Sequence, residues 1–201
     1  MFRGFLAATT EFGNDEVYYV LYAMFPALSH FDHPPMTGIF IQLFSLDLLL
    51  RHEFFIRLGA ILSSAISTLI IYFIGKNAHN ERAGYFAALL YTASVYASVI
   101  AGTFILPDAP QMIFWMLSLL FLQKSILRDP KEKVTTTYML AAGITIGLGM
   151  LSKYTSAFLW AGAFLYILFY NRKWFTSWAL WVAGIFTILI FLPVVFWNIN
   201  N

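Results

Sequence analysis

The sequence contains no cysteine and few charged residues. Without cysteine, the chain can form neither disulfides nor metal sites built on thiolate ligands. Only 11% of its 201 residues are charged, whereas soluble domains carry about 25%. The net charge of +2 is too small to indicate a nucleic-acid partner. These shortages exclude an ordinary soluble domain and favour an integral membrane protein.

Apolar residues make up most of what is present. They account for 60% of the chain, and 21 Phe, 11 Tyr and 6 Trp suit helices that pack in lipid and end at its interfaces. A spanning helix needs about 20 mostly apolar residues. We therefore predict an all-α, polytopic bundle with about six transmembrane helices. The candidate spans are Leu58–Gly75, Ala83–Leu106, Ala109–Leu127, Val134–Ser152, Tyr154–Asn171 and Phe175–Trp197.

The basic residues are distributed unevenly between the two ends of these spans. Eight of the twelve lie in loops on one side: Lys76, Arg82, Lys124, Arg128, Lys131, Lys133, Arg172 and Lys173. Because positively charged loops stay in the cytoplasm, the opposite side is predicted to be extracytoplasmic. That side holds residues 1–57, the Pro107–Pro110 turn, a hairpin at Lys153 and the residues after Trp197.

Residues 13–57 fit neither a span nor an ordinary loop. Val17–Ser29 and Pro34–Ser45 are uncharged runs too short to cross a bilayer. We predict that they form two juxtamembrane amphipathic helices along the extracytoplasmic surface. The chain then divides into an N-terminal remnant with these helices (residues 1–57), a six-helix region (58–197) and the start of an extracytoplasmic loop (198–201).

Three short acidic motifs fall on the predicted extracytoplasmic side. Taken singly, they are typical of a capped helix start, a rigid turn and a capped first helical turn. Their shared location favours a functional interpretation, because charge near a bilayer is costly and carboxylates gathered at one surface indicate a polar site. The motifs are Asp15-Glu16, Asp32-His33-Pro34-Pro35 and Pro107-Asp108-Ala109-Pro110.

The residue types in these motifs suit acid–base and phosphate chemistry. One carboxylate can act as general base toward a hydroxyl, and a second can bind a divalent metal or orient the nucleophile. His33, beside Asp32, is a metal ligand, a donor to phosphate or a solvated turn residue. Lys153 lies between two nearly uncharged helices, where it either snorkels to the headgroups or binds the phosphate of a lipid-linked substrate.

In this order, the motifs resemble those of the polytopic glycosyltransferases of the GT-C fold. The nearest likeness is the bacterial branch related to lipid A aminoarabinose transferase and protein O-mannosyltransferases. The resemblance covers essentially the whole chain. The segments that carry it are "NDEVYYVLYA", "HFDHPPMTGIFIQL", "IRLGAILSSAISTLIIYFIGK", "LPDAPQMIFWMLSL", "GLGMLSKYTS" and "FLPVVFWNIN".

The resemblance implies a bacterial inner-membrane enzyme that takes a sugar from a polyprenyl-phosphate donor at the extracytoplasmic face. It would pass the sugar, with inversion, to a hydroxyl or phosphate acceptor on a lipid, glycan or protein. It also implies a role for each motif residue. Asp15 is the presumed base, Glu16 its supporting partner, Asp32 a metal-binding carboxylate, His33 a phosphate contact or metal ligand, Asp108 an acid near the acceptor, and Lys153 the contact to the carrier phosphate.

Two departures from the family pattern affect these expectations. Relatives begin with a spanning helix before the acidic pair, of which Phe2–Thr10 would be a remnant, and they continue past the sixth span. We therefore expect a fragment that is inactive by itself. A transporter or flippase is the alternative function, but it would favour charged or broken helices at mid-bilayer. A non-catalytic scaffold, in which the clustered acids are accidental, is the third.

Overall fold

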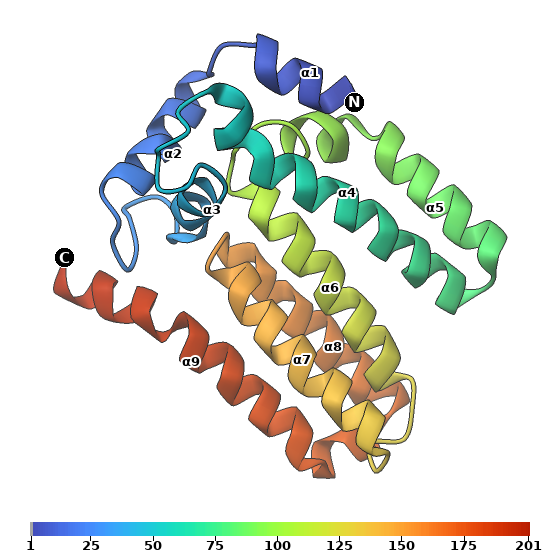
Figure 1. Ribbon diagram of the computed structural model, residues 1–201. Helices are drawn as coiled ribbons and strands as arrows, with labels where there is room; N and C mark the ends of the chain where they lie inside the picture. Colours follow the sequence, from blue (N-terminus) through green and yellow to red (C-terminus); the bar gives the residue numbers. More distant parts are fainter. Residues whose placement is uncertain (1) are drawn as a thin grey trace.

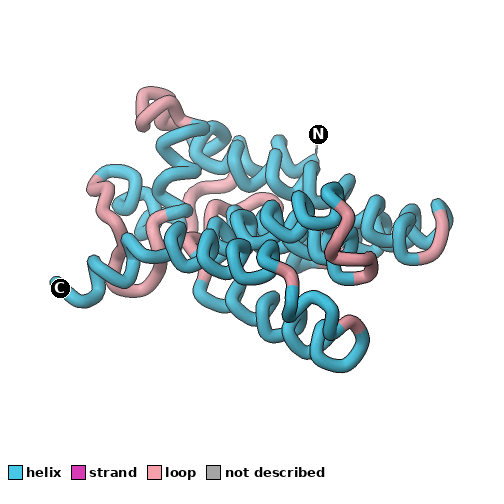
Figure 2. Tube along the Cα trace, turned by 90° about the horizontal axis from the view of Figure 1, so that it is seen from below, coloured by secondary structure: helices cyan, strands magenta, loops and turns pink. Residues whose placement is uncertain are grey.

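The computed structural model describes residues 2–201, and this part of the chain folds into helices without any strand (Figures 1 and 2). The all-α class predicted from the sequence is therefore confirmed. The α-helices are α1 (Phe2–Thr9), α2 (Asn14–Met24), α3 (Met36–Phe44), α4 (Glu53–Ala78), α5 (Glu81–Ala93), α6 (Asp108–Ile126), α7 (Lys133–Met150), α8 (Phe158–Tyr170) and α9 (Trp178–Asn200). Three shorter helical turns are η1 (Tyr96–Ile100), η2 (Tyr154–Ala157) and η3 (Arg172–Thr176).

Two of the described helices are long and apolar enough to cross a membrane, as judged by length and composition. They are α4, with 26 residues, and α9, with 23. At 1.5 Å per residue, both exceed the roughly 30 Å of a hydrocarbon core. The predicted count of six spans is not confirmed, because the remaining helices are shorter or less apolar.

The predicted span Ala83–Leu106 is wrong as a single helix. Helix α5 ends at Ala93, a single π-helical stretch follows as η1, and the chain then turns without regular structure to α6. Small residues permit this compact path: a Cβ on Gly102 would overlap the carbonyl oxygen of Ala97 and the hydroxyl of Ser64 on α4. Hydropathy cannot separate such a buried apolar segment from a helix that faces lipid.

The other end of the chain also differs from expectation. Residues 198–200 continue α9, although a loop is predicted from the sequence to start there. Asparagine side chains support this last turn, because Asn198 donates to the carbonyl of Val194 at 2.8 Å and Asn200 donates to that of Phe196 at 2.9 Å. Asn201 donates to the carbonyl of Trp197 at 2.9 Å, which is one of the last four carbonyls that a helix end leaves without an intrahelical partner.

The two predicted surface helices correspond to α2 and α3, which are both shorter than expected. The chain leaves the helical conformation after Met24 and returns to it at Met36. The two helices pack closely at Gly38, where a Cβ would lie 2.8 Å from the backbone of Tyr22. A hydrogen bond from Gln42 to the carbonyl of Ala23, at 3.1 Å, further joins them. Their predicted position along the membrane surface stays a prediction.

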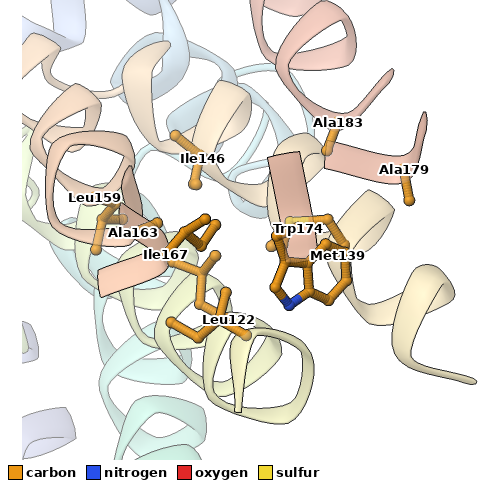
Figure 3. Close-up of a cluster of buried hydrophobic side chains, with 11 residues drawn as sticks. Leu122, Met139, Ile146, Leu159, Ala163, Ile167, Trp174, Ala179 and Ala183 are labelled. Atoms are coloured by element: carbon orange, nitrogen blue, oxygen red, sulfur yellow. The ribbon is translucent and has the colours of Figure 1, made fainter. Parts of the chain in front are cut away.

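A buried apolar cluster holds α6, α7, α8 and α9 together (Figure 3). Trp174 of η3 is its largest member, is fully buried and lies beside Met139 of α7 (Figure 3). Helices α7 and α9 approach closely at Gly143, where a Cβ would overlap the carbonyl oxygen of Ala183. Small residues at such a crossing let two helix backbones pack tightly.

The predicted motifs and the basic loops around α7 lie at opposite ends of the fold. Helices α1, α2 and α3 gather near the start of α6 and the turn between α7 and α8, whereas the α6–α7 and α8–α9 loops lie at the opposite end (Figure 1). A backbone hydrogen bond from Met36 to the carbonyl of Leu151, at 3.0 Å, joins α3 directly to the end of α7. All the predicted site residues therefore lie at one end of the fold.

Candidate functional site

Asp108 and Lys153 form an ion pair at this end of the fold. Asp108 is the first residue of α6, and Lys153 precedes η2 after the turn that ends α7. The Lys153 Nζ lies 2.9 Å from Asp108 Oδ1, and the Tyr96 hydroxyl donates to the same oxygen. Burial raises the pKa of Asp108, but the hydrogen bonds from Tyr96 and Lys153 and the charge of Lys153 outweigh it, so that the pKa is lowered. Asp108 is therefore ionised at neutral pH.

A cavity of about 330 Å³ opens beside this ion pair. Its lining combines polar groups with apolar side chains, which suits a ligand with a polar head and an apolar body. Gln111 is anchored on its wall, because its Nε2 donates to Thr155 at 2.7 Å and to Ser156 at 3.0 Å. The lining residues are Tyr96, Asp108, Gln111, Met112, Trp115, Met116, Lys153 and Thr155.

Asp32 lies in the turn between α2 and α3 and is held by tyrosines of α2. The Tyr18 hydroxyl donates to Asp32 Oδ2 at 2.9 Å, and Tyr22 donates to the Tyr18 oxygen at 3.4 Å. The ring of His30 stacks on Tyr22 with centroids 3.6 Å apart. Sequence reasoning did not find these contacts, although tyrosines at positions i and i+4 share one helix face.

His33 is half-buried beside the same groups. Burial and the charge of Lys153 lower its pKa, while Asp32 and Asp108 act in the opposite direction. The imidazole is therefore neutral at pH 7. Its Nδ1 is buried and has no hydrogen-bond partner within the described residues.

The charges of all three predicted aspartates reach one side chain, Tyr19 of α2. Burial raises the pKa of its phenol to about 12, with further contributions from the charges of Asp15, Asp32 and Asp108. Asp15 itself is exposed in the first turn of α2 and lines a separate hollow of about 480 Å³ with Phe104 and Leu106. No hydrogen bond within residues 2–201 joins Asp15 to the Asp108–Lys153 pair. Asp15 and Asp108 thus line two different hollows, while the charge of Asp32 reaches the same tyrosine.

Glu16 differs from the other acids because it is buried in a paired site. It is 2% exposed, and its partner Arg57 on α4 is fully buried. The guanidinium donates to both carboxylate oxygens, from Nε at 2.8 Å and from Nη2 at 2.6 Å. The backbone N–H groups of Gly13 and Ile105 donate to the same carboxylate, each at 3.1 Å. Four donors therefore occupy Glu16, and this geometry favours a structural role for it.

Arg57 uses its remaining donors to hold the end of α1. Its Nη1 donates to the carbonyls of Ala7 at 3.0 Å and Thr10 at 2.7 Å, and its Nη2 donates to that of Glu11 at 3.0 Å. Sequence reasoning missed this residue, because it placed the span start at Leu58 and left Arg57 in the polar segment before it. An arginine within an apolar helix was the available signal.

The predicted metal site lacks a full set of protein ligands. Among residues 2–201, no group of three or more His, Cys, Asp or Glu side chains is placed to hold a metal ion. One oxygen of Asp32 is also engaged by Tyr18. The side chains around Asp32 and His33 do not fit a divalent ion by themselves, and the chemistry proposed below uses the protein's own groups.

Comparison with known proteins identifies the family. Residues 32–197 match the family model described as dolichyl-phosphate-mannose-protein mannosyltransferase. This range includes Asp32, His33, Asp108 and Lys153 but excludes Asp15 and Glu16. No solved structure matches the chain.

A bacterial relative supports the same assignment. The chain is 30% identical over 123 residues to an undecaprenyl phosphate-alpha-4-amino-4-deoxy-L-arabinose arabinosyl transferase of Pectobacterium atrosepticum. The match covers 59% of this chain and 21% of the relative, so the chain spans about a fifth of that protein's length. The resemblance to lipid-linked-sugar glycosyltransferases inferred from the motifs is confirmed. The chain belongs to the dolichyl-phosphate-mannose-protein mannosyltransferase family.

Proposed function

We propose that the complete protein is a membrane glycosyltransferase that moves a sugar from a polyprenyl-phosphate donor to a hydroxyl or phosphate acceptor, with inversion, at the extracytoplasmic face of a bacterial inner membrane. The Asp108–Lys153 pair beside its cavity carries this proposal, since it places a carboxylate and an ammonium 2.9 Å apart at the motif end of the fold. The family match and the name of the bacterial relative, which specifies an undecaprenyl phosphate substrate, support the donor class.

Lys153 is the group that would stabilise the departing carrier phosphate. Negative charge develops on that phosphate as the glycosidic bond breaks, and a positioned ammonium lowers the barrier by stabilising it. In the structure Lys153 is paired with Asp108. When the donor phosphate binds, this ion pair would break or the Lys153 ammonium would contact both anions.

The acceptor hydroxyl needs a base, and the aspartates offer two candidates. Asp15 is exposed at its own hollow and has no hydrogen-bonded cation among the described residues, which leaves it free to accept a proton. Asp108 is ionised, but Lys153 and Tyr96 already bind one of its oxygens. Asp15 is therefore the first choice for the base, and Asp108 is the second.

Transfer from a labelled polyprenyl-phosphate sugar tests these roles in the complete protein. We expect Asp15→Asn and Lys153→Met each to lower the rate by about 100-fold or more, as is typical for the loss of an acid–base group or a charge-stabilising donor. Asp47→Asn is a matched control, because Asp47 is an exposed acid in a turn at the same end. Its φ of 55° is one that asparagine adopts readily. Normal transfer by Asp15→Asn would reject its role as base, and normal transfer by both variants would reject the proposed site.

A further inference from the structure

A third hollow lies at the opposite end of the fold, between the α6–α7 loop and the start of α9. Its volume is about 670 Å³. Three lysines line it, while Asp129 is the one acid among the lining residues. The full lining is Asp129, Pro130, Lys131, Lys133, Thr136, Lys173, Thr176, Ser177 and Trp178. The hollow therefore carries an excess of positive charge together with several hydroxyl groups.

The acids at this end neutralise only part of that charge. Asp129 lies 3.8 Å from the Lys173 ammonium and accepts a hydrogen bond from the backbone N–H of Lys131 at 2.9 Å. Glu132 accepts a hydrogen bond from the Thr135 hydroxyl at 3.3 Å and does not line the hollow. Lys131 and Lys133 have no acidic partner within the described residues, so two ammonium groups remain available to an anion.

Two long helices begin at this hollow and add to its positive potential. Helix α7 starts at Lys133 and α9 at Trp178, and neither has a side-chain hydrogen bond at its N-cap. Figure 1 shows both starts at the same end of the bundle. The free N–H groups and the dipole of a helix N-terminus favour bound anions.

An apolar stripe leads away from the hollow along α9. Trp178, which lines the hollow, is 61% exposed, and Trp181, Ile185 and Leu189 follow it at helical spacings of three and four residues. These side chains are all more than half exposed, so they form one outward face of α9. Tryptophan is typical of the membrane–water interface. A ligand with a charged head and an apolar tail would match the hollow and the stripe together.

We propose that this hollow binds the phosphate of an anionic phospholipid, whose acyl chains lie along the exposed stripe of α9. The lysines of the two loops and the N-termini of α7 and α9 contact the phosphate, and Trp178 covers the glycerol region. Basic pockets between membrane helices on the cytoplasmic side bind anionic headgroups in this manner. The site is independent of the glycosyltransferase site, because it lies at the other end of the fold.

Native mass spectrometry of the complete protein in neutral detergent tests this proposal. Phosphatidylglycerol and phosphatidylcholine of identical acyl chains are titrated against the unmodified protein and two double variants. Lys133→Gln/Lys173→Gln removes one ion-paired lysine and one unpaired lysine from the hollow. Lys76→Gln/Arg82→Gln is the matched control, because it removes an ion-paired lysine from the last turn of α4 and another cation from the first turn of α5.

Each basic residue near an anionic surface strengthens binding about fivefold. We therefore expect the hollow variant to bind phosphatidylglycerol roughly 30-fold more weakly, and the control variant to bind it within about twofold of the unmodified protein. Equal weakening in both variants, or equal affinity for the two lipids, would overturn the proposal. Inorganic phosphate alone forms a third arm. Displacement of the lipid by equimolar phosphate would identify a free-phosphate site instead and would also overturn it.

Discussion

The Glu16–Arg57 pair offers the sharpest test of how this end of the fold is built. We predict that Glu16→Gln destabilises the protein far more than it affects any chemical step directly. The substitution removes the negative charge from a site where Arg57 is fully buried, while the size and shape of the side chain stay nearly the same. An unpaired buried charge cannot recover its hydration, and this penalty drives the loss of stability.

The expected magnitude follows from the burial of both partners. Breaking a buried ion pair by removing one charge costs about 3–5 kcal/mol of unfolding free energy. The two N–H groups of Gly13 and Ile105 that donate to Glu16 also lose their charged acceptor. The unfolding free energy of a native protein is only about 5–15 kcal/mol. The variant should therefore unfold at a much lower temperature or denaturant concentration.

Unfolding of the complete protein in detergent, followed by circular dichroism, measures this loss. Glu81→Gln is the matched control: Glu81 forms an ion pair of 2.7 Å with Lys76, but the pair is solvent-exposed, so its removal should leave the midpoint unchanged. Replacing both buried partners, as in Glu16→Met/Arg57→Met, should recover part of the stability, since no unpaired charge remains. A Glu16→Gln protein with an unchanged midpoint and abolished sugar transfer would refute this reasoning and assign Glu16 to catalysis.

Two further predictions follow from the packing and from the charges. Gly143→Ala should destabilise the protein by about 1–3 kcal/mol, because its Cβ overlaps the carbonyl of Ala183, whereas Gly162→Ala has nothing within 4 Å and should stabilise α8 by about 0.5–1 kcal/mol. Equal midpoints for the two variants in thermal unfolding would contradict the α7–α9 crossing. His33 should titrate below its ordinary pKa of 6.5 by NMR, and Lys153→Met should raise that pKa because a neighbouring positive charge is removed. Because the pKa of His33 is lower in the folded state than in the unfolded chain, the unfolded state takes up the proton first, so the protein should lose stability as the pH falls from 6.5 to the folded-state pKa. An unchanged His33 titration in Lys153→Met would show that the two residues do not interact.

The proposed mechanism depends on residues that are far apart in the chain and that the fold brings together. Asp108 and Lys153 are 45 residues apart in the chain and become partners only because α6 and α7 pack side by side. Asp32 approaches them on the turn that Tyr18 holds against α2. A substitution at Tyr18 would therefore reach the site through Asp32, without any contact of its own with the ion pair.

The amino-acid sequence by itself determined the helical class and the membrane character of this protein. Scarce charge and abundant apolar residues decide where a chain can be stable, and this physical requirement is readable from composition alone. The sequence also indicated that the acidic motifs and Lys153 share one end of the fold, because loops alternate between the two sides of a bundle. The family follows from the same motifs and was confirmed by comparison.

The tertiary structure decided how those residues are used. Side-chain partners such as Arg57 for Glu16 are 41 residues apart in the chain, and no local pattern encodes such a pairing. The break after Ala93 likewise arises because Gly102 and Ala97 can pack against Ser64 of α4, a contact that hydropathy does not report. Composition and periodicity describe how each segment meets its solvent, whereas burial and pairing depend on which segments meet one another.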